Sequence, residues 1–237
     1  MTQRNDILGY GKVIYQDKAT FRFSLDSVLL ANFLTVNSKV KRICDLGTGN
    51  AVIPLILSTR TKAGITGIEL QPNIYNLAIR SVKENNLEQQ ISIINNDIKD
   101  IKQYLENNSY DAVVANPPFF KNSDKLNESE SKRLARHEVT IDLEDIIKAG
   151  SYLLRDKGYF ALVIRPDRLL EVTTLMQKYR IEPKRMQICY PKDNTEANVC
   201  LIEGIMNGNP GIKILSPLTI HEENGEYTTK IKELFKL

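Results

Sequence analysis

The tetrapeptide Asn116-Pro117-Pro118-Phe119 constrains the fold of this chain more than any other stretch. It follows the apolar run AVVA at residues 112–115, which is typical of a buried parallel strand. Neither proline has an N–H to donate to a sheet, so the strand must end at Asn116. We therefore expect the Asn116 side chain at the carboxyl end of a strand, where open α/β sheets bind ligands.

The same tetrapeptide predicts a rigid pair of hydrogen-bond acceptors. Each proline fixes its own φ and restricts the residue before it, so the Asn116 side chain and the Pro117 carbonyl are expected at a constant separation. Two such acceptors suit a planar amino group with two N–H bonds, and the Phe119 ring offers a flat face for stacking. The alternative is a proline-rich turn with a core phenylalanine, and the tetrapeptide alone does not separate the two.

A glycine-rich turn is expected where an earlier apolar run ends. The sequence DLGTGN occupies residues 45–50, and an apolar helix is predicted over residues 51–58. Gly47 and Gly49 allow a tight bend and a close backbone approach to a ligand. Val52 breaks the dinucleotide fingerprint G-x-G-x-x-G, and no P-loop Gly-Lys-Ser/Thr follows. An acid followed by two glycines indicates a ligand with a cationic amino group rather than a ligand with a pyrophosphate.

Two further acids stand at expected strand ends. Glu69 ends the second apolar run, about one β-α-β unit after Asp45, where an acid can accept both hydroxyls of a ribose. The alternative for Glu69 is a solvated helix cap. Asp97 follows the run at residues 91–94 and can accept the amino group of an adenine, with Ile98 packing on the ring. Asp97 can equally be the N-cap of a helix predicted over residues 99–105, and the two roles are compatible.

The N-terminal part predicts a hairpin and a helix. Residues 9–23 indicate a short hairpin, with residues 13–15 and 21–23 as its strands. A helix is expected to begin around Ser24 and Asp26, and either residue can cap it. The alternative function of this turn is to lie over a ligand pocket.

Composition sets wide bounds. The chain has 237 residues, 42% of them hydrophobic and 26% charged, which is ordinary for a globular protein of one or two domains. The net charge of +3 permits an anionic partner without indicating one. Cys44, Cys189 and Cys200 form no close pair and predict free structural thiols in a reducing cytoplasm, not disulfides or a metal site. No membrane span or signal peptide is expected, since no apolar run reaches about 18 residues.

Two polar segments are candidates for contact with nucleic acid. Residues 121–138 predict a substrate-facing loop, with a merely solvated lid as the alternative. Its candidate phosphate contacts are Arg133, Arg136 and His137. Residues 178–192 carry a local basic excess, although lysines at strand edges also prevent aggregation. The candidates there are Lys178, Lys184 and Arg185.

The ordered row Asp45, Glu69, Asp97 and Asn116 resembles the class I S-adenosylmethionine-dependent methyltransferases. The resemblance implies an α/β, Rossmann-like fold: a seven-stranded, mostly parallel sheet with the last strand antiparallel, helices on both faces, and a short N-terminal hairpin and helix. It implies a single methyltransferase domain over residues 1–237. Within it, residues 1–40 would cover the cofactor site, residues 41–206 would form the catalytic core, and residues 207–237 would be an extension.

The resemblance also implies roles for residues. In this family the glycine loop holds the methionine part of the cofactor, the acid after the second strand binds the ribose, and the acid after the third strand reads the adenine. The implied cofactor-binding residues are Ser24, Asp26, Asp45, Gly47, Thr48, Gly49, Glu69, Leu70, Asp97, Ile98 and Asn116. Asn-Pro-Pro-aromatic marks members that methylate a planar nitrogen: adenine N6, guanine N2, cytosine N4 or glutamine N5. The implied catalytic residues are Asn116, Pro117 and Phe119.

The closer pattern is similar to the bacterial tRNA adenine-N6 methyltransferases that act on adenine 37 of a valine tRNA. It rests on FRFSLDSVLLANF, DLGTGNAVIPL, NPPFF and ARHE, and it extends over roughly residues 8–205. The sequence departs from the pattern at Phe119, where many adenine-specific members have Tyr, and at Asn50-Ala51, where a third glycine is frequent. The resemblance implies S-adenosyl-L-methionine as cofactor, tRNA as partner, a cytoplasmic monomer or weak homodimer, and no metal or membrane.

Three alternatives remain beside this hypothesis. A glutamine-N5 protein methyltransferase shares the Asn-Pro-Pro logic, but its family has a sizeable helical domain where this chain has a predicted hairpin before Asp45. A guanine-N2 rRNA methyltransferase is not excluded by the sequence. A non-catalytic S-adenosylmethionine-binding RNA adaptor is the alternative outside the enzymes, and the intact Asn116–Phe119 tetrapeptide argues against it.

Overall fold

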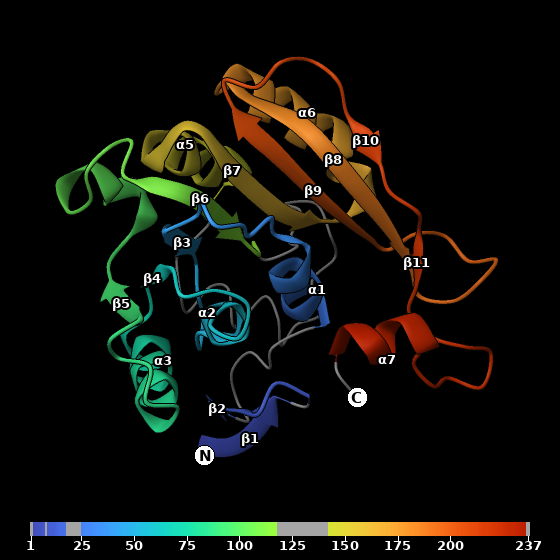
Figure 1. Cartoon of the computed structure of the whole chain (residues 1–237), viewed down its shortest axis with the longest axis horizontal. Coiled ribbons are helices and arrows are strands. Elements are labelled where there is room, and N and C mark those ends of the chain that lie inside the picture. The colour runs from blue at the N-terminus through green and yellow to red at the C-terminus, as the bar shows by residue number, and fades with distance from the viewer. Residues whose placement is uncertain (1, 8, 18–24, 118–141, 236–237) are drawn as a thin grey trace, which may run out of the picture.

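The computed structural model describes residues 2–7, 9–17, 25–117 and 142–235 of the chain (Figure 1). Several sequence-based predictions lie outside the described residues. They concern Ser24, the strand at residues 21–23, Pro118, Phe119, and the loop at residues 121–138 with Arg133, Arg136 and His137.

A twisted sheet runs through the centre of the molecule (Figure 1), and its described strands follow the order β10-β8-β9-β7-β6-β3-β4-β5, with β11 also paired to β8. The seven longer strands are β3 (Arg42–Leu46), β4 (Gly64–Glu69), β5 (Ile91–Asn95), β6 (Tyr110–Ala115), β7 (Leu154–Ile164), β8 (Ile181–Tyr190) and β9 (Val199–Met206). Strand β9 is antiparallel to both neighbours, β7 and β8, while β5, β4, β3, β6 and β7 pair in parallel. The predicted seven-stranded arrangement is confirmed, and two short strands, β10 (Lys213–Ile214) and β11 (Leu218–Thr219), extend it beside β8.

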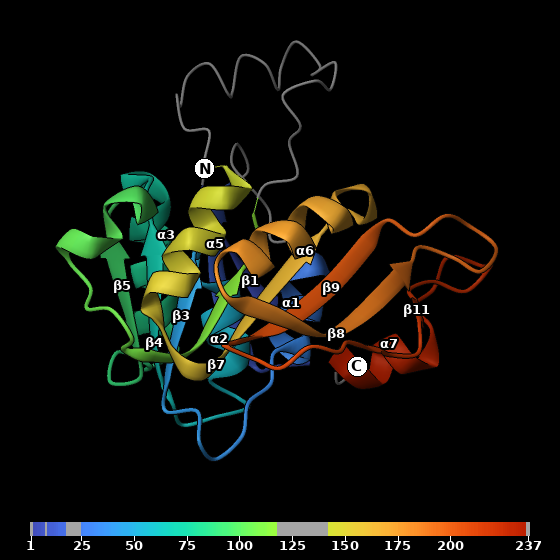
Figure 2. The ribbon, with the colours of Figure 1, turned by 90° about the horizontal axis from the view of Figure 1, so that it is seen from above.

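Helices cover both faces of the sheet, as predicted. One face carries α1 (Leu25–Phe33), α2 (Val52–Leu57), α3 (Pro72–Glu84) and the C-terminal α7 (Thr229–Phe235). The other carries η1 (Ile98–Gln103), α5 (Leu143–Leu153), η2 (Pro166–Arg168) and α6 (Leu169–Lys178), and Figure 2 shows α5 and α6 side by side. A hydrophobic core layer lies on each face of the sheet, and each central strand contributes side chains to both layers because successive side chains alternate between faces. In β6, for example, Ala112 and Val114 belong to the layer under α1, and Val113 and Ala115 to the layer under α5.

The N-terminal hairpin exists, but its strands differ from the prediction. It consists of β1 (Thr2–Ile7) and β2 (Lys12–Asp17), paired antiparallel. The predicted strand at residues 13–15 lies within β2, and its predicted partner at residues 21–23 lies outside the described residues. The turn lies between β1 and β2, where Gly9 and Gly11 take positive φ values of 75° and 59° that favour glycine. Strand β1 escaped detection because Ile7 is its single buried side chain.

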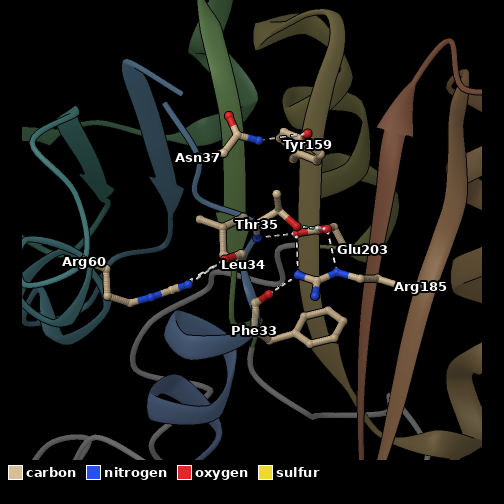
Figure 3. Close-up of polar contacts among 8 residues, drawn as sticks. All are labelled: Phe33, Leu34, Thr35, Asn37, Arg60, Tyr159, Arg185 and Glu203. Atoms are coloured by element: carbon tan, nitrogen blue, oxygen red, sulfur yellow. Dashed lines mark hydrogen bonds and ion pairs between the residues drawn. The ribbon is translucent and has the colours of Figure 1, made fainter. Parts of the chain in front are cut away.

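The carboxyl end of α1 is held by two arginines and a buried acid (Figure 3). Arg60 donates to the carbonyl oxygens of Ala31 and Leu34, and Arg185 donates to that of Phe33. Glu203, 2% exposed, accepts from Arg185 Nε at 2.8 Å and from both Thr35 N and Thr35 Oγ1 at 2.7 Å. Cations suit a helix carboxyl end, whose carbonyls lack helical partners. Helix α1 is therefore bonded firmly to the sheet and to the segment after α2.

The three cysteines, Cys44, Cys189 and Cys200, are buried free thiols, as predicted. None of the described helices is long and apolar enough to cross a membrane. No group of three or more metal-binding side chains occurs within the described ranges.

Candidate active site

The parallel register brings the predicted strand-end residues to one edge of the sheet. Leu46, the last residue of β3, is paired with Ile68 of β4 and with Ala115 of β6. The residues that follow, Gly47, Glu69 and Asn116, therefore stand at the same level on three adjacent strands. The pairing of Glu69 with Asn95 brings β5 to the same edge. The glycine turn and the Asn-Pro segment are thus neighbours in space.

The glycine turn presents open backbone at this edge. Gly47 and Gly49 have φ values of 73° and 59°, and a Cβ built on either would meet nothing within 4 Å. Ala51, fully buried, has a φ of 69°, the left-handed conformation that a third glycine would adopt more easily. The departure from the family pattern at this position is therefore tolerated at a cost of about 1 kcal/mol in backbone strain.

Asp45 is fully buried beneath the turn. Its Oδ2 accepts a hydrogen bond from Thr48 Oγ1 at 2.6 Å, while its Oδ1 has no hydrogen-bond partner in the part of the chain that the structure describes. Burial raises the pKa of Asp45 to about 7; the Thr48 hydroxyl opposes this shift and the nearby Glu69 charge adds to it. A buried acceptor without a donor is costly, so this oxygen is suited to a ligand that brings a cationic N–H group.

Glu69 links the glycine turn to the start of α3. Its Oε2 accepts from Gly49 N at 3.0 Å and its Oε1 from Gln71 N at 2.8 Å. Burial raises the pKa of Glu69, and the backbone N–H groups oppose the shift. A carboxylate has about four acceptor positions, so two bonds leave capacity for ribose hydroxyls. Asn95 Nδ2 donates to the carbonyls of Glu69 and Leu70 at 2.8 and 2.9 Å, a support that the sequence did not indicate.

Asp97 is the N-cap of η1, which is one of the two roles that the sequence predicted for it. Its Oδ1 accepts from Lys99 N at 2.9 Å, and η1 is a 3-10 helix of residues Ile98–Gln103 rather than an α-helix over residues 99–105. Its carbonyl accepts from Tyr104 Oη at 2.8 Å, which steadies the same turn. The Ile98 side chain is 4% exposed and belongs to the core layer under α5. The adenine contacts of Asp97 and Ile98 stay predictions.

Asn116 makes a contact that sequence reasoning missed. Its Nδ2 donates to Ser27 Oγ at 2.8 Å, and among the described residues its Oδ1 has no hydrogen-bond partner. Ser27 lies in the first turn of α1, directly after Asp26, and is 6% exposed. The motif around α1 pointed to Ser24 and Asp26, but the contact spans 89 positions and no local pattern indicates it. Pro117 follows, buried.

A second missed residue is Gln16 of β2. Among the described residues, the buried side-chain atoms without a hydrogen-bond partner are Gln16 Nε2, Asp45 Oδ1 and Asn198 Oδ1. Gln16 adjoins Tyr15, whose carbonyl accepts from Asn50 Nδ2 of the glycine turn at 3.4 Å. The Gln16 amide oxygen accepts from Asn5 Nδ2 of β1 at 3.1 Å, so the hairpin contacts the glycine turn through the Tyr15 carbonyl.

The predicted basic edge is engaged in contacts within the chain. Lys178 pairs with Glu144 at 2.6 Å, and Lys184 Nζ donates to the carbonyls of Asn209 and Gly211 at 2.9 and 2.6 Å. Arg185, 28% exposed at its side chain, belongs to the cluster at the end of α1. None of these bonds involves a residue of the strand-end row, and contact of the three cations with RNA stays a prediction.

Comparisons with known proteins agree with this geometry. A family model described as the methyltransferase small domain matches residues 21–180. A protein of Bacteroides fragilis is 25% identical over 224 residues, 94% of each chain, and one of Porphyromonas gingivalis is 33% identical over 180 residues, 73% of this chain and 70% of that protein. Both carry the name tRNA1(Val) (adenine(37)-N6)-methyltransferase.

Solved structures show the same fold. A crystal structure from Agrobacterium tumefaciens, described as a predicted O-methyltransferase, superposes with a TM-score of 0.72 at 21% identity, covering 89% of this chain and 95% of that one. Geranyl diphosphate C-methyltransferase of Streptomyces coelicolor, solved with S-adenosyl-L-homocysteine, has a TM-score of 0.57 at 11% identity and 76% coverage of both chains. Because the family model matches residues 21–180, more than half of the sequence, the chain belongs to the methyltransferase small domain family.

Proposed function

We propose that this methyltransferase transfers the methyl group of S-adenosyl-L-methionine to the exocyclic N6 amino group of an adenine in tRNA, adenine 37 of a valine tRNA in particular. The observation that carries the proposal is the Asn116 amide. Its nitrogen is bonded to Ser27 at 2.8 Å, and its oxygen remains an acceptor beside the glycine turn. The names of the relatives support the choice of tRNA and adenine.

The residues at the strand ends fit the proposed cofactor. Asp45 Oδ1, buried and without a hydrogen-bond partner among the described residues, would accept from its cationic amino group. The open backbone at Gly47 and Gly49 leaves room for the methionine part, and Glu69 retains acceptor capacity for the ribose. When bound, the cofactor supplies a methyl group already activated by a sulfonium.

The protein's contribution to the reaction is orientation. The lone pair of adenine N6 is delocalised into the ring, so the free amine is a poor nucleophile. Asn116 Oδ1 and the Pro117 carbonyl would accept its two N–H hydrogens, increase electron density on the nitrogen and hold it in line for transfer. The proton released from the amine passes to water, so no side-chain base is required.

The target base must leave its stack to reach this edge. An anticodon loop offers bases that unstack at a small energetic cost, which favours tRNA over a paired rRNA stem. The sequence assigns Phe119 to stack on the extruded base, where stacking is worth about 1–3 kcal/mol per base.

A radiolabelled-methyl assay tests the proposal. The protein should label unmodified bulk tRNA and a valine tRNA transcript, and nucleoside digestion should release N6-methyladenosine. The label should disappear when adenine 37 of the transcript is changed to guanine. Label in rRNA as N2-methylguanosine would contradict the proposed substrate, and absence of label from every RNA would contradict the proposed activity.

Substitution of Asn116 tests the site itself. Asn116→Ala should abolish transfer while the affinity for S-adenosyl-L-homocysteine stays within about twofold, because the lost contacts are made to the target amine. Asn37→Ala is the matched control, since Asn37 contacts Tyr159 at 3.2 Å in the cluster of Figure 3 and lies outside the strand-end row. Near-normal turnover in Asn116→Ala would contradict the assigned role.

A further inference from the structure

The bond between Ser27 and Asn116 joins α1 to the end of β6. Among the described residues neither side chain makes another hydrogen bond, and the donor–acceptor distance of 2.8 Å is that of a well-formed bond. Ser27 is 6% exposed, so water competes little for its hydroxyl. An amide has its nitrogen and oxygen on opposite sides, so a nitrogen held by α1 turns the oxygen away from that helix.

Helix α1 is a stable support for this contact. Its carboxyl end is bonded to Arg60 and to the Arg185–Glu203 pair, as Figure 3 shows. Its middle is buried, with Leu29 and Leu30 1% and 0% exposed in the core layer. A side chain on such an element is held more accurately than one on a loop.

The asparagine needs such a support. Rotation about its Cβ–Cγ bond by half a turn would place Nδ2, a donor, against the N–H bonds of a target amine. Proximity accounts for much of the acceleration of such transfers, and misplacement by about 1 Å can cost on the order of 100-fold in rate. The backbone restraint from Pro117 fixes where the side chain starts, but it leaves the rotation of the amide free.

We propose that Ser27 is a positioning residue for methyl transfer: its hydroxyl holds the Asn116 amide so that Oδ1 faces the amino group of the acceptor. The inference rests on the proposed function, because the acceptor is the planar amine assigned there. The chemical basis is a single hydrogen bond, so the effect is expected in the rate of transfer and not in the binding of the cofactor.

Ser27→Ala tests the inference against a matched serine. Ser109 is also 6% exposed, lies directly before the amino end of β6, and donates to the Glu106 carbonyl at 2.7 Å. Ser27→Ala should lower kcat roughly tenfold, the factor that corresponds to one hydrogen bond of about 1.4 kcal/mol. Ser109→Ala should leave kcat within twofold. Both variants should keep the affinity for S-adenosyl-L-homocysteine within twofold and should have similar midpoints of thermal unfolding.

A kcat for Ser27→Ala within twofold of that for Ser109→Ala would overturn the inference. So would a loss of activity accompanied by an equal loss of cofactor affinity, since that pattern indicates general disorder at the site. Either result leaves the proposed function standing as long as the wild-type protein methylates its tRNA.

The contact can also be measured without any RNA or cofactor. In protein labelled with ¹⁵N-asparagine, the side-chain NH₂ signals of Asn116 are identified by their loss in Asn116→Ala. In Ser27→Ala these signals should move upfield and approach each other, as the hydrogen bond and the hindered environment are lost, and in Ser109→Ala they should not move. Unmoved signals in Ser27→Ala would overturn the inference directly. A wild-type protein with the contact but without activity on any RNA would instead overturn the proposed function, and the catalytic meaning of the contact with it.

Discussion

Two buried carboxylates, Glu203 and Asp45, have similar exposed fractions of 2% and 0% but differ in how fully they are hydrogen-bonded and ion-paired. Glu203 has both oxygens bonded, to Arg185 and to Thr35, and the cluster fastens the end of α1 (Figure 3). Among the described residues, Asp45 accepts one hydrogen bond, from Thr48, has no ion pair, and has one oxygen without a hydrogen-bond partner. The two carboxylates therefore differ in pairing, and the incomplete pairing of Asp45 is what we propose a ligand amine completes.

The difference follows from the energetics of burial. A buried charge is tolerated when an opposite charge and hydrogen bonds replace its hydration, and Glu203 meets that condition. Asp45 does not, and the result is a pKa raised to about 7 by burial. In the proposed function, a cation that binds Asp45 would supply the missing partner, and ionisable groups with shifted pKa values are frequent at functional sites.

The largest expected effect is on the paired acid. Glu203→Gln removes the charge opposite Arg185, and we expect the free energy of unfolding in urea to fall by about 3 kcal/mol. Glu226→Gln is the control, since Glu226 pairs with Lys232 at 3.0 Å on the surface and should cost under about 0.5 kcal/mol. A loss of no more than about 0.5 kcal/mol for Glu203→Gln would remove the contrast between the two acids.

The unpaired acid should respond in the opposite way. Asp45→Asn removes a buried charge that lacks a partner, so the free energy of unfolding should stay the same or rise. The affinity for S-adenosyl-L-homocysteine, measured by calorimetry, should fall by about 10- to 100-fold, the range for a hydrogen bond to a charged group. A loss of stability as large as that in Glu203→Gln would show that Asp45 is a structural residue.

The raised pKa of Asp45 predicts a pH dependence. Between its usual 3.8 and about 7 this carboxyl binds more protons in the folded than in the unfolded protein, so its contribution to stability, complete below 3.8, is lost as pH rises to about 7. Ligand binding should show the reverse trend, because only the ionised form attracts a cationic amine. Affinity for S-adenosyl-L-homocysteine should be roughly tenfold weaker at pH 6 than at pH 8. Asp45→Asn should remove this dependence, and an equal slope in that variant would assign it to another group.

The smallest expected effect concerns the hydroxyl that bonds to Asp45. Thr48→Val deletes the contact that opposes the shift, so the pKa of Asp45 should rise further and the binding profile should move to higher pH. At pH 7 we expect an affinity about threefold weaker, a difference that vanishes at pH 9. Thr66→Val, which alters the Tyr110 contact at 3.0 Å on the neighbouring strand, should leave the profile in place. A profile that Thr48→Val does not move would show that the Thr48 hydroxyl does not tune this carboxyl.

Predictions based on local rules succeeded. The positions of Gly47, Glu69 and Asn116 at one edge follow from apolar runs that end at glycine, acid and proline, and parallel pairing then aligns them. Strand β1 of the hairpin was not predicted, because it is polar at almost every position and offers no periodic signal. Asp97 illustrates an intermediate case: its place was predicted, but the described contacts show the capping role, and the adenine role stays a prediction.

By itself the sequence determined which residues follow the successive strands. They are an acid with two glycines, a second acid, a third acid, and an asparagine between a buried strand and two prolines. These are properties of neighbouring residues, and backbone sterics and periodicity suffice to infer them. Only the tertiary structure decided which oxygens are left without partners, because that depends on side chains brought together from distant positions, as Ser27 with Asn116 and Arg185 with Glu203. Whether a buried polar group is satisfied is a property of the packed core, and no local pattern encodes it.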